Sequence, residues 1–161
     1  MSWPEPVQRV ASVLEQAAAE ARLEEFAGGT PTAVDAANAA GCKLAQIVKS
    51  LVFECDGRSI LAMVPGDRRA DPGKVGAAAG CSRAKIAGPE RVREATGFDP
   101  GAVAPFPLPR ITDVFVDLRL LTHERVWAGA GSPKHMVGLP PGELVRLTRA
   151  RTADLSADAR G

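Results

Sequence analysis

Two β-rich runs joined by an Asp-Gly pair constrain the fold of this chain more than any other feature. The first run covers residues 46–53 and reads Gln-Ile-Val-Lys-Ser-Leu-Val-Phe, and the second covers residues 59–64. Between them stands Asp56-Gly57, a pair that favours the tight turns of β-hairpins. The sequence therefore predicts an antiparallel hairpin with long arms, against which the rest of the chain must pack.

Lys49 stands among large apolar residues on one face of the first arm, because side chains alternate between the two faces of a strand. These neighbours are Ile47, Leu51 and Phe53. A lone buried ammonium is costly, so this lysine is expected to be paired or to line a cavity. Two alternatives stay open: the stem packs while the head reaches water, or the register slips by one residue and exchanges the faces.

The length and composition fit one domain over residues 1–161. Hydrophobic residues make up 45% and charged residues 24% of the chain, which is the globular range. Tyrosine is absent and aromatics total 4%, so the core must consist mainly of aliphatic side chains. The net charge of +1 means that an anionic partner must be met by a local basic patch.

Several classes of protein are excluded by missing patterns. Cys42, Cys55 and Cys81 form no CxxC pair, so we expect reduced thiols in a cytoplasmic protein rather than a zinc or dithiol site. No Walker loop, dinucleotide fingerprint or Gly-x-Ser-x-Gly elbow occurs, and His123 and His135 lack partners at metal-ligand spacing. We therefore expect no cofactor and no metal. A signal peptide or membrane-spanning run is also not apparent, which argues against a membrane partner.

The predicted elements alternate between helices and strands. Helical spacing predicts an N-terminal helix over about 5–27, ended by Gly28-Gly29. Capping and stop signals predict further helices over about 32–41, 71–80, 89–97 and 141–147. Strands are expected over 84–87, 111–117, 124–128 and 134–139, and the tail from about 148 is expected to fray. This order, together with the antiparallel hairpin, predicts the α+β (mixed α/β) class with a mixed sheet.

Two glycine-containing loops are candidates for substrate contact. Gly101 to Pro105 opens a loop whose backbone N–H groups would suit a carbonyl or an oxyanion, although it also reads as an ordinary connector. Gly129 to Ser132 would let a ligand pass close to the backbone, although it also reads as a flexible turn. His135 follows that turn and is a candidate for lining a cavity.

A cluster of basic residues follows the second arm of the hairpin. It comprises Arg68, Arg69, Lys74, Arg83 and Lys85. If these side chains converge in space, they form an edge that binds phosphate. The alternative, a solvated helix face, stays open.

The ordered set of motifs resembles the YbaK/EbsC family. The 46–53 run looks like its QIVKSLVF signature, and Pro65-Gly66-Asp67, the GxxxP loop at 101–105 and the 129–131 turn follow in the family's order. The resemblance covers roughly residues 30–148. It implies a mixed, barrel-like sheet flanked by helices, similar to the editing domain of bacterial prolyl-tRNA synthetase.

The activity implied by this resemblance is that of a trans-editing aminoacyl-tRNA deacylase. Such a protein hydrolyses the ester of mischarged tRNA, here tRNA(Pro) carrying Cys, Ala or another small amino acid. The family's functional lysine falls on Lys49, and its substrate-loop residues fall on Gly101 and Pro105. Ser50, which follows the lysine, and the positions around Gly129, Gly131 and His135 correspond to the pocket side.

The implied partners are mischarged tRNA and, as further candidates, prolyl-tRNA synthetase or an elongation factor, but not DNA. Because water can attack the ester, the implied chemistry requires positioning and charge stabilisation rather than a protein nucleophile. Two other functions stay open on the residues alone. One is a non-catalytic module that binds tRNA or a synthetase, and the other is a hydrolase of small esters or amides.

Overall fold

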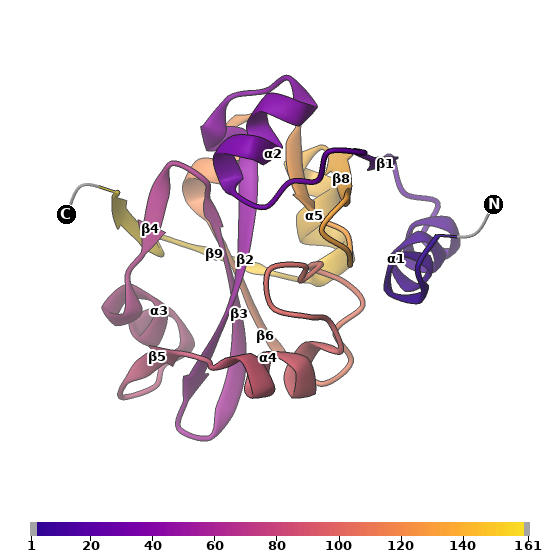
Figure 1. The fold of residues 1–161 in the computed structure, drawn as a ribbon. Coiled ribbons are helices and arrows are strands. Elements are labelled where there is room, and N and C mark those ends of the chain that lie inside the picture. Colours follow the sequence, from indigo (N-terminus) through magenta and orange to yellow (C-terminus); the bar gives the residue numbers. More distant parts are fainter. Residues whose placement is uncertain (1–2, 160–161) are drawn as a thin grey trace.

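The computed structural model describes residues 3–159, in which helices surround an eight-stranded mixed sheet and a separate two-stranded sheet (Figure 1). The helices are α1 (Glu5–Gln16), α2 (Ala33–Ala40), α3 (Pro72–Ala79), α4 (Pro89–Thr96) and α5 (Pro141–Thr148), with short 3-10 turns at Leu44–Gln46 and Leu118–Thr122. The first strands are β1 (Arg22–Glu25), β2 (Ile47–Cys55), β3 (Arg58–Pro65), β4 (Arg68–Ala70) and β5 (Ala84–Ile86). The later strands are β6 (Asp113–Asp117), β7 (Val126–Gly129), β8 (His135–Leu139), β9 (Arg151–Ala153) and β10 (Ser156–Asp158).

The predicted hairpin lies at the centre of the sheet. β2 and β3 pair antiparallel from Val48–Pro65 to Cys55–Arg58, and the strand order is β1-β8-β7-β2-β3-β6-β9, with β5 also paired to β2. Parallel pairs (β2 with β7, β3 with β6, β6 with β9) stand beside antiparallel ones. The predicted mixed α/β class is therefore confirmed. The sheet is open, because β1 and β9 form its two ends and are not paired with each other.

Both faces of β2 are covered, as the alternation of its side chains predicts. Val48 and Val52 pack into the larger apolar cluster on one face, whereas Phe53 and Cys55 pack into a second cluster on the other. All four are at least 95% buried. A strand between two cores fixes the direction of every side chain along it, because a slip by one residue would exchange the faces.

The helix boundaries follow the predicted caps closely. The Thr32 hydroxyl accepts a bond from the main-chain N–H of Asp35, and the Asp71 carboxylate accepts bonds from Gly73 and Lys74. Gly41, Gly80 and Gly97 end α2, α3 and α4 in the left-handed conformation that glycine favours.

The predicted N-terminal helix over 5–27 is wrong in its second half. α1 ends at Gln16, and the chain turns so that β1 pairs antiparallel with β8. The alanine-rich stretch favours helix locally, but Leu23 on β1 gains more by packing against the larger core as part of an edge strand. Such tertiary preferences do not appear in helical spacing.

The predicted fraying of the tail is also wrong. β9 pairs parallel with β6, β10 pairs antiparallel with β4, and Leu155 between them is fully buried in the second core cluster. Most residues of this segment are small or polar, so its composition does not reveal that Leu155, its one large apolar residue, anchors it in the core.

The expectation of three reduced cysteines is contradicted. Cys55 at the end of β2 and Cys81 after α3 form a disulfide, with their Cα atoms 6.0 Å apart. β5 pairs with β2 up to Cys55 and thereby brings the two thiols together. The two cysteines are 26 positions apart, and no local pattern in the sequence indicates that they meet. Cys42 is the remaining free cysteine.

Candidate active site

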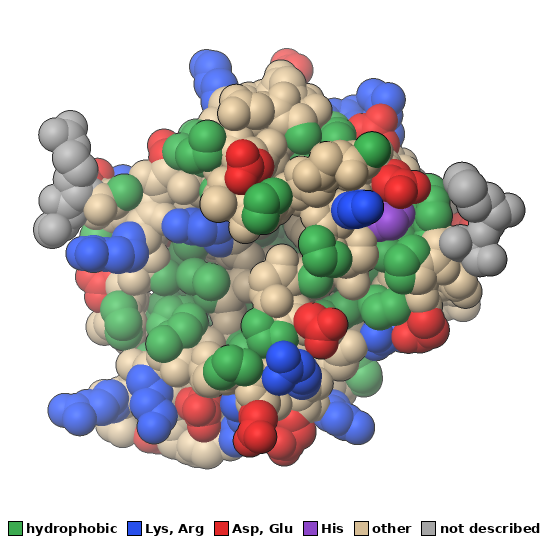
Figure 2. Space-filling view, in the orientation of Figure 1, with side chains coloured by type: hydrophobic (Ala, Val, Ile, Leu, Met, Phe, Trp, Pro, Cys, Tyr) green, Lys and Arg blue, Asp and Glu red, His purple; other side chains and the backbone are tan. Residues whose placement is uncertain are grey.

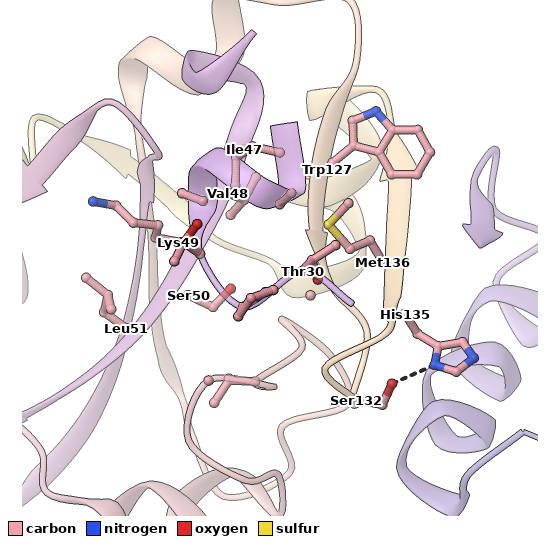
Figure 3. A pocket seen from close by; sticks show the side chains of 17 residues that line it. Thr30, Ile47, Val48, Lys49, Ser50, Leu51, Trp127, Ser132, His135 and Met136 are labelled. Atoms are coloured by element: carbon pink, nitrogen blue, oxygen red, sulfur yellow. Dashed lines mark hydrogen bonds between the residues drawn. The ribbon is translucent and has the colours of Figure 1, made fainter. Parts of the chain in front are cut away.

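A gap beside β2 creates the candidate site. β7 pairs only with Ile47 and Val48 at the start of β2, and β5 pairs only with its end, from Phe53 to Cys55. The middle of β2 therefore has no strand on that side, and a cavity of about 280 Å³ opens there (Figure 3). Its lining comes from β2, α2 and the segment before it, β7, β8 and the 101–103 loop.

The structure brings most of the predicted site residues to this cavity. Those that line it are Lys49, Ser50, Gly101, Gly129 and His135. Pro105 and Gly131 are not part of the lining: Pro105 is buried, and a Cβ on Gly131 would lie 2.9 Å from the carbonyl carbon of Pro6. Gly131, with φ +100°, therefore allows the turn to pack against the start of α1.

Lys49 is half-buried at one end of the cavity. Its ammonium group points away from Ser132 and His135 (Figure 3) and donates a hydrogen bond to the main-chain carbonyl of Arg68. Burial lowers the pKa of Lys49, and the negative charge of Asp67 opposes that change. An ammonium has three donors, so this lysine keeps donors for an anionic group at the mouth of the cavity.

Ser50 presents both its side chain and its backbone to the gap. Its hydroxyl is buried and has no hydrogen-bond partner among the described residues. The carbonyl of Val52 accepts a bond from Ala87 on the side away from β3. Since backbone groups alternate sides along a strand, those of Ser50 face the same way. Ser50 thus offers its unpaired backbone N–H and carbonyl to a molecule in the cavity, and its unpaired hydroxyl lies buried beside them.

The two predicted glycine loops meet at Gly129. A Cβ on this residue would lie 2.9 Å from the main-chain oxygen of Val103. Only glycine therefore lets the 101–105 loop approach β7 so closely. This contact explains why glycine is needed at the end of β7. Direct access for a ligand is not the only reason.

His135 is almost fully buried, and its ring points toward α1 rather than into the cavity (Figure 3). Its Nδ1 lies 2.6 Å from the Ser132 hydroxyl oxygen. The Trp3 ring packs edge-on against the imidazole, with the two ring centres 5.3 Å apart. A carboxylate oxygen of Glu25 lies 3.8 Å from Nε2. Burial lowers the pKa of His135, which Glu25 raises in part and Lys134 lowers further. The imidazole therefore lies outside the cavity and supports the wall to which Ser132 belongs.

Several lining residues are absent from the sequence-based prediction. These are Thr30, Thr32, Ala36, Trp127 and Met136, among others. Thr32 is recognisable as a helix cap, but nothing in the sequence places the start of α2 opposite β2. Trp127 and Met136 read as ordinary strand residues, and only the pairing of β7 with β8 brings them to one wall.

The predicted basic cluster is divided among different environments. Arg68 and Lys74 bond to the C-terminal segment, whereas Arg69, Arg83 and Lys85 are exposed. β4, which carries Arg68 and Arg69, lies at the opposite end of α3 from β5, which carries Lys85 (Figure 1). Figure 2 accordingly shows Lys and Arg side chains at several separate places along this face.

The sequence and the fold together identify the family. The profile of the aminoacyl-tRNA editing domain matches residues 27–147, which include every residue that lines the cavity. The chain belongs to this family of aminoacyl-tRNA editing domains. The resemblance inferred from the motifs is thereby confirmed.

Relatives of two kinds share the domain. The chain is 32% identical over 123 residues to the uncharacterised protein YwhH of Bacillus subtilis, covering 76% of this chain and 78% of that protein. It is 38% identical over 98 residues to the proline–tRNA ligase of Moorella thermoacetica, covering 60% of this chain but only 17% of the ligase. Against such ligases, the chain therefore corresponds to one part of a much longer protein.

The fold is shared with solved structures. A crystal structure described as a candidate trans-editing enzyme for prolyl-tRNA synthetase superimposes with a TM-score of 0.90 at 37% identity. The match covers 97% of this chain and 99% of that one.

Residues 3–159 contain no cluster of three or more His, Cys, Asp or Glu side chains that could hold a metal ion. Over the same residues, no helix has both the length and the apolar character needed to cross a bilayer.

Proposed function

We propose that this protein is a trans-editing deacylase that hydrolyses the ester of mischarged tRNA(Pro) carrying Cys, Ala or another small amino acid. The observation that carries the proposal is the cavity beside the unpaired middle of β2, with Lys49 at its mouth and the polar groups of Ser50 inside it. Membership of the aminoacyl-tRNA editing family supports the reaction class.

The size of the cavity supports a small aminoacyl group. Its volume of about 280 Å³ is at the lower limit of ordinary ligand pockets, which span about 300–1,000 Å³. Ile47, Trp127 and Met136 make part of the wall apolar. An aminoacyl ester would fit inside, while the terminal nucleotide and its phosphates would stay at the mouth.

The reaction needs no nucleophile from the protein. A water molecule attacks the ester carbonyl, the bond between that carbon and the ribose oxygen breaks, and the products are the free amino acid and tRNA with its hydroxyl restored. The neighbouring ribose hydroxyl is suited to help activate the water. The protein contributes by holding the ester and by offering donors to the developing oxyanion, as the N–H and hydroxyl of Ser50 can do.

Lys49 is best suited to clamp a phosphate. Its ammonium lies at the mouth, beside Arg68 and away from Ser132 and His135. A group in that position meets the charged part of the tRNA end rather than the ester carbon. Lys49 would thereby fix the distance between the terminal nucleotide and the polar groups of Ser50.

A deacylation panel tests this proposal. The purified protein is incubated with Ala-, Cys-, Ser- and Pro-tRNA(Pro), and the remaining aminoacyl ester is measured over time. We expect hydrolysis of one or more of the mischarged species, while Pro-tRNA(Pro) is spared. If none of the four aminoacyl-tRNAs is hydrolysed but tRNA binding is measurable, the proposal would be overturned in favour of a non-catalytic binding module. Hydrolysis of aminoacyl esters that lack tRNA at the same rate would favour a small-ester hydrolase instead.

A further inference from the structure

The C-terminal segment reaches the Lys49 ammonium through one intermediate residue. Lys49 donates to the main-chain carbonyl of Arg68 on β4. The Arg68 side chain is in turn fixed to β10: its Nε donates to the Ser156 hydroxyl at 2.8 Å and its Nη2 to the Ser156 carbonyl at 3.1 Å. Its Nη1 pairs with Asp158 at 3.0 Å. Three directed bonds therefore hold the residue whose carbonyl binds Lys49.

Ser156 is itself anchored in the core by Asp117. The Ser156 hydroxyl donates to the Asp117 carboxylate at 2.8 Å, and the main-chain N–H of Leu155 donates to the same oxygen at 2.9 Å. Both Asp117 and Ser156 are fully buried. Burial alone would raise the pKa of Asp117, but bonds from Arg119, Leu155 and Ser156 outweigh it and lower that pKa. A charged, fully bonded carboxylate thus holds the segment in place.

β4 depends on this segment for its position. It is only three residues long, and β10 is its sole strand partner among the described residues. Lys74 adds to the attachment by donating to the Ser156 carbonyl at 2.8 Å and pairing with Asp154 at 3.0 Å. Without these contacts, β4 would be held near Lys49 only by its short connection to β3, where the N–H of Gly66 donates to the carbonyl of Ile47.

We propose that Arg68 and Ser156 are positioning residues, which set the Lys49 ammonium at the mouth of the cavity through the chain Asp117–Ser156–Arg68–Lys49. The inference rests on the proposed function of Lys49. It assigns a role to β10, which lies beyond residues 27–147 of the editing-domain profile. It also gives Arg68 a task other than direct contact with tRNA phosphate, because its guanidinium is already committed to Ser156 and Asp158.

The decisive variant is Ser156→Ala, because a fully buried serine cannot touch tRNA. Arg68→Ala removes the next step of the same chain. Ser82→Ala is the matched control for the serine, since its hydroxyl also donates to a carboxylate at 2.8 Å, that of Asp56. Arg58→Ala is the control for the arginine: its guanidinium bonds to Asp113 and to the Ala79 carbonyl at the far end of the hairpin.

We expect Ser156→Ala and Arg68→Ala to lower kcat/KM for deacylation by about tenfold, because a displaced ammonium holds the substrate phosphate less well and in the wrong place. Both controls should leave kcat/KM unchanged. Two results would overturn the inference: unchanged kcat/KM in Ser156→Ala, or a lowered kcat/KM in Arg68→Ala with no effect of Ser156→Ala. The second result would mean that Arg68 contacts tRNA directly.

A readout without activity separates this inference from the proposed function. The Nζ and Cε resonances of Lys49, assigned by their loss in Lys49→Ala, report the environment of the ammonium in the full chain. They should shift in Ser156→Ala and Arg68→Ala but not in the controls, and circular dichroism confirms that each variant is folded. Unshifted Lys49 resonances in the folded variants would refute positioning. Shifted resonances in a protein with no deacylase activity would refute only the proposed function.

Discussion

Ser50 carries one of the buried polar groups at the candidate site that have no hydrogen-bond partner among the described residues. Its buried hydroxyl has no partner among the described residues, so Ser50→Ala removes no bond within the fold. We expect the free energy of unfolding to stay within about 1 kcal/mol of the wild type. Deacylation should slow by about tenfold, the worth of one lost hydrogen bond to the substrate.

Ser59→Ala is the matched control for this prediction. The Ser59 hydroxyl accepts a bond from Arg91 Nε at 2.9 Å, so its removal should cost stability and leave deacylation unchanged. Chemical denaturation and deacylation rates check both variants. A Ser50→Ala variant that loses stability but keeps full activity would show that the hydroxyl serves the fold.

His135 should make stability depend on pH. Its pKa is lowered by burial in the folded protein, so the unfolded chain binds a proton more readily. Unfolding then takes up a proton, and the free energy of unfolding falls as pH drops below about 6.5, the usual value for histidine. Glu25 and Lys134 are the charged groups that modify this shift, in opposite directions.

The His135→Gln variant tests this dependence. Melting temperatures measured from pH 7.5 to 5.5 should fall in the wild type and fall less in the variant. An equal fall in both proteins would assign the acid sensitivity to other groups.

At the scale of single residues, the sequence predicted what alternation along one strand can show. Lys49 was recognisable because it interrupts an apolar face. Ser50 was recognisable only as its neighbour in the motif, since its unpaired backbone depends on where β5 and β7 end. Trp127 and Met136 needed the register of β7 with β8, which no local pattern contains.

At the scale of elements, the disulfide between β2 and the turn after α3 makes a direct prediction. It closes a loop of 26 residues, and such a link is worth about 3.5 kcal/mol in the chain-entropy account. Cys81→Ser should lower the free energy of unfolding by about this amount, and dithiothreitol should have the same effect on the wild type. Thiol titration of the unfolded, unreduced wild type should find one thiol, that of Cys42. Three thiols and no effect of reductant would contradict the assignment.

The elements that the sequence predicted well are those with local signals. Caps and glycine stops define α2, α3 and α4, and the Asp56-Gly57 turn defines the central hairpin. The elements it missed are β1, β4, β9 and β10, which are three or four residues long. Short edge strands are decided by their partners, because three residues carry too little periodicity to be distinguished from a loop.

At the scale of the whole molecule, the placement of the basic residues limits how strongly salt can weaken tRNA binding. Arg68 and Lys74 are committed to the C-terminal segment, which leaves Lys49 and three exposed members of the cluster. Four phosphate contacts at the single-stranded end correspond to a slope of about −3 for log binding constant against log salt concentration, whereas six would give about −4. Titrations of tRNA at several salt concentrations measure this slope. A slope of about −4 would mean that Arg68 and Lys74 leave their partners on binding.

The mixed α/β architecture followed from the sequence because the order of helices and strands and one antiparallel hairpin already exclude most alternatives. What could not follow was the open gap beside β2, since it arises where two short strands stop. The site of this protein is therefore a consequence of strand lengths as much as of the residues that line it.

If Lys49 is essential to hydrolysis of mischarged tRNA, single-turnover deacylation by Lys49→Ala will show it. We predict that this variant keeps the wild-type melting temperature within a few degrees, because Lys49 is only half-buried. Its rate on the best substrate of the panel should fall by about a hundredfold or more. A folded Lys49→Ala protein that hydrolyses this substrate at the wild-type rate would contradict the account.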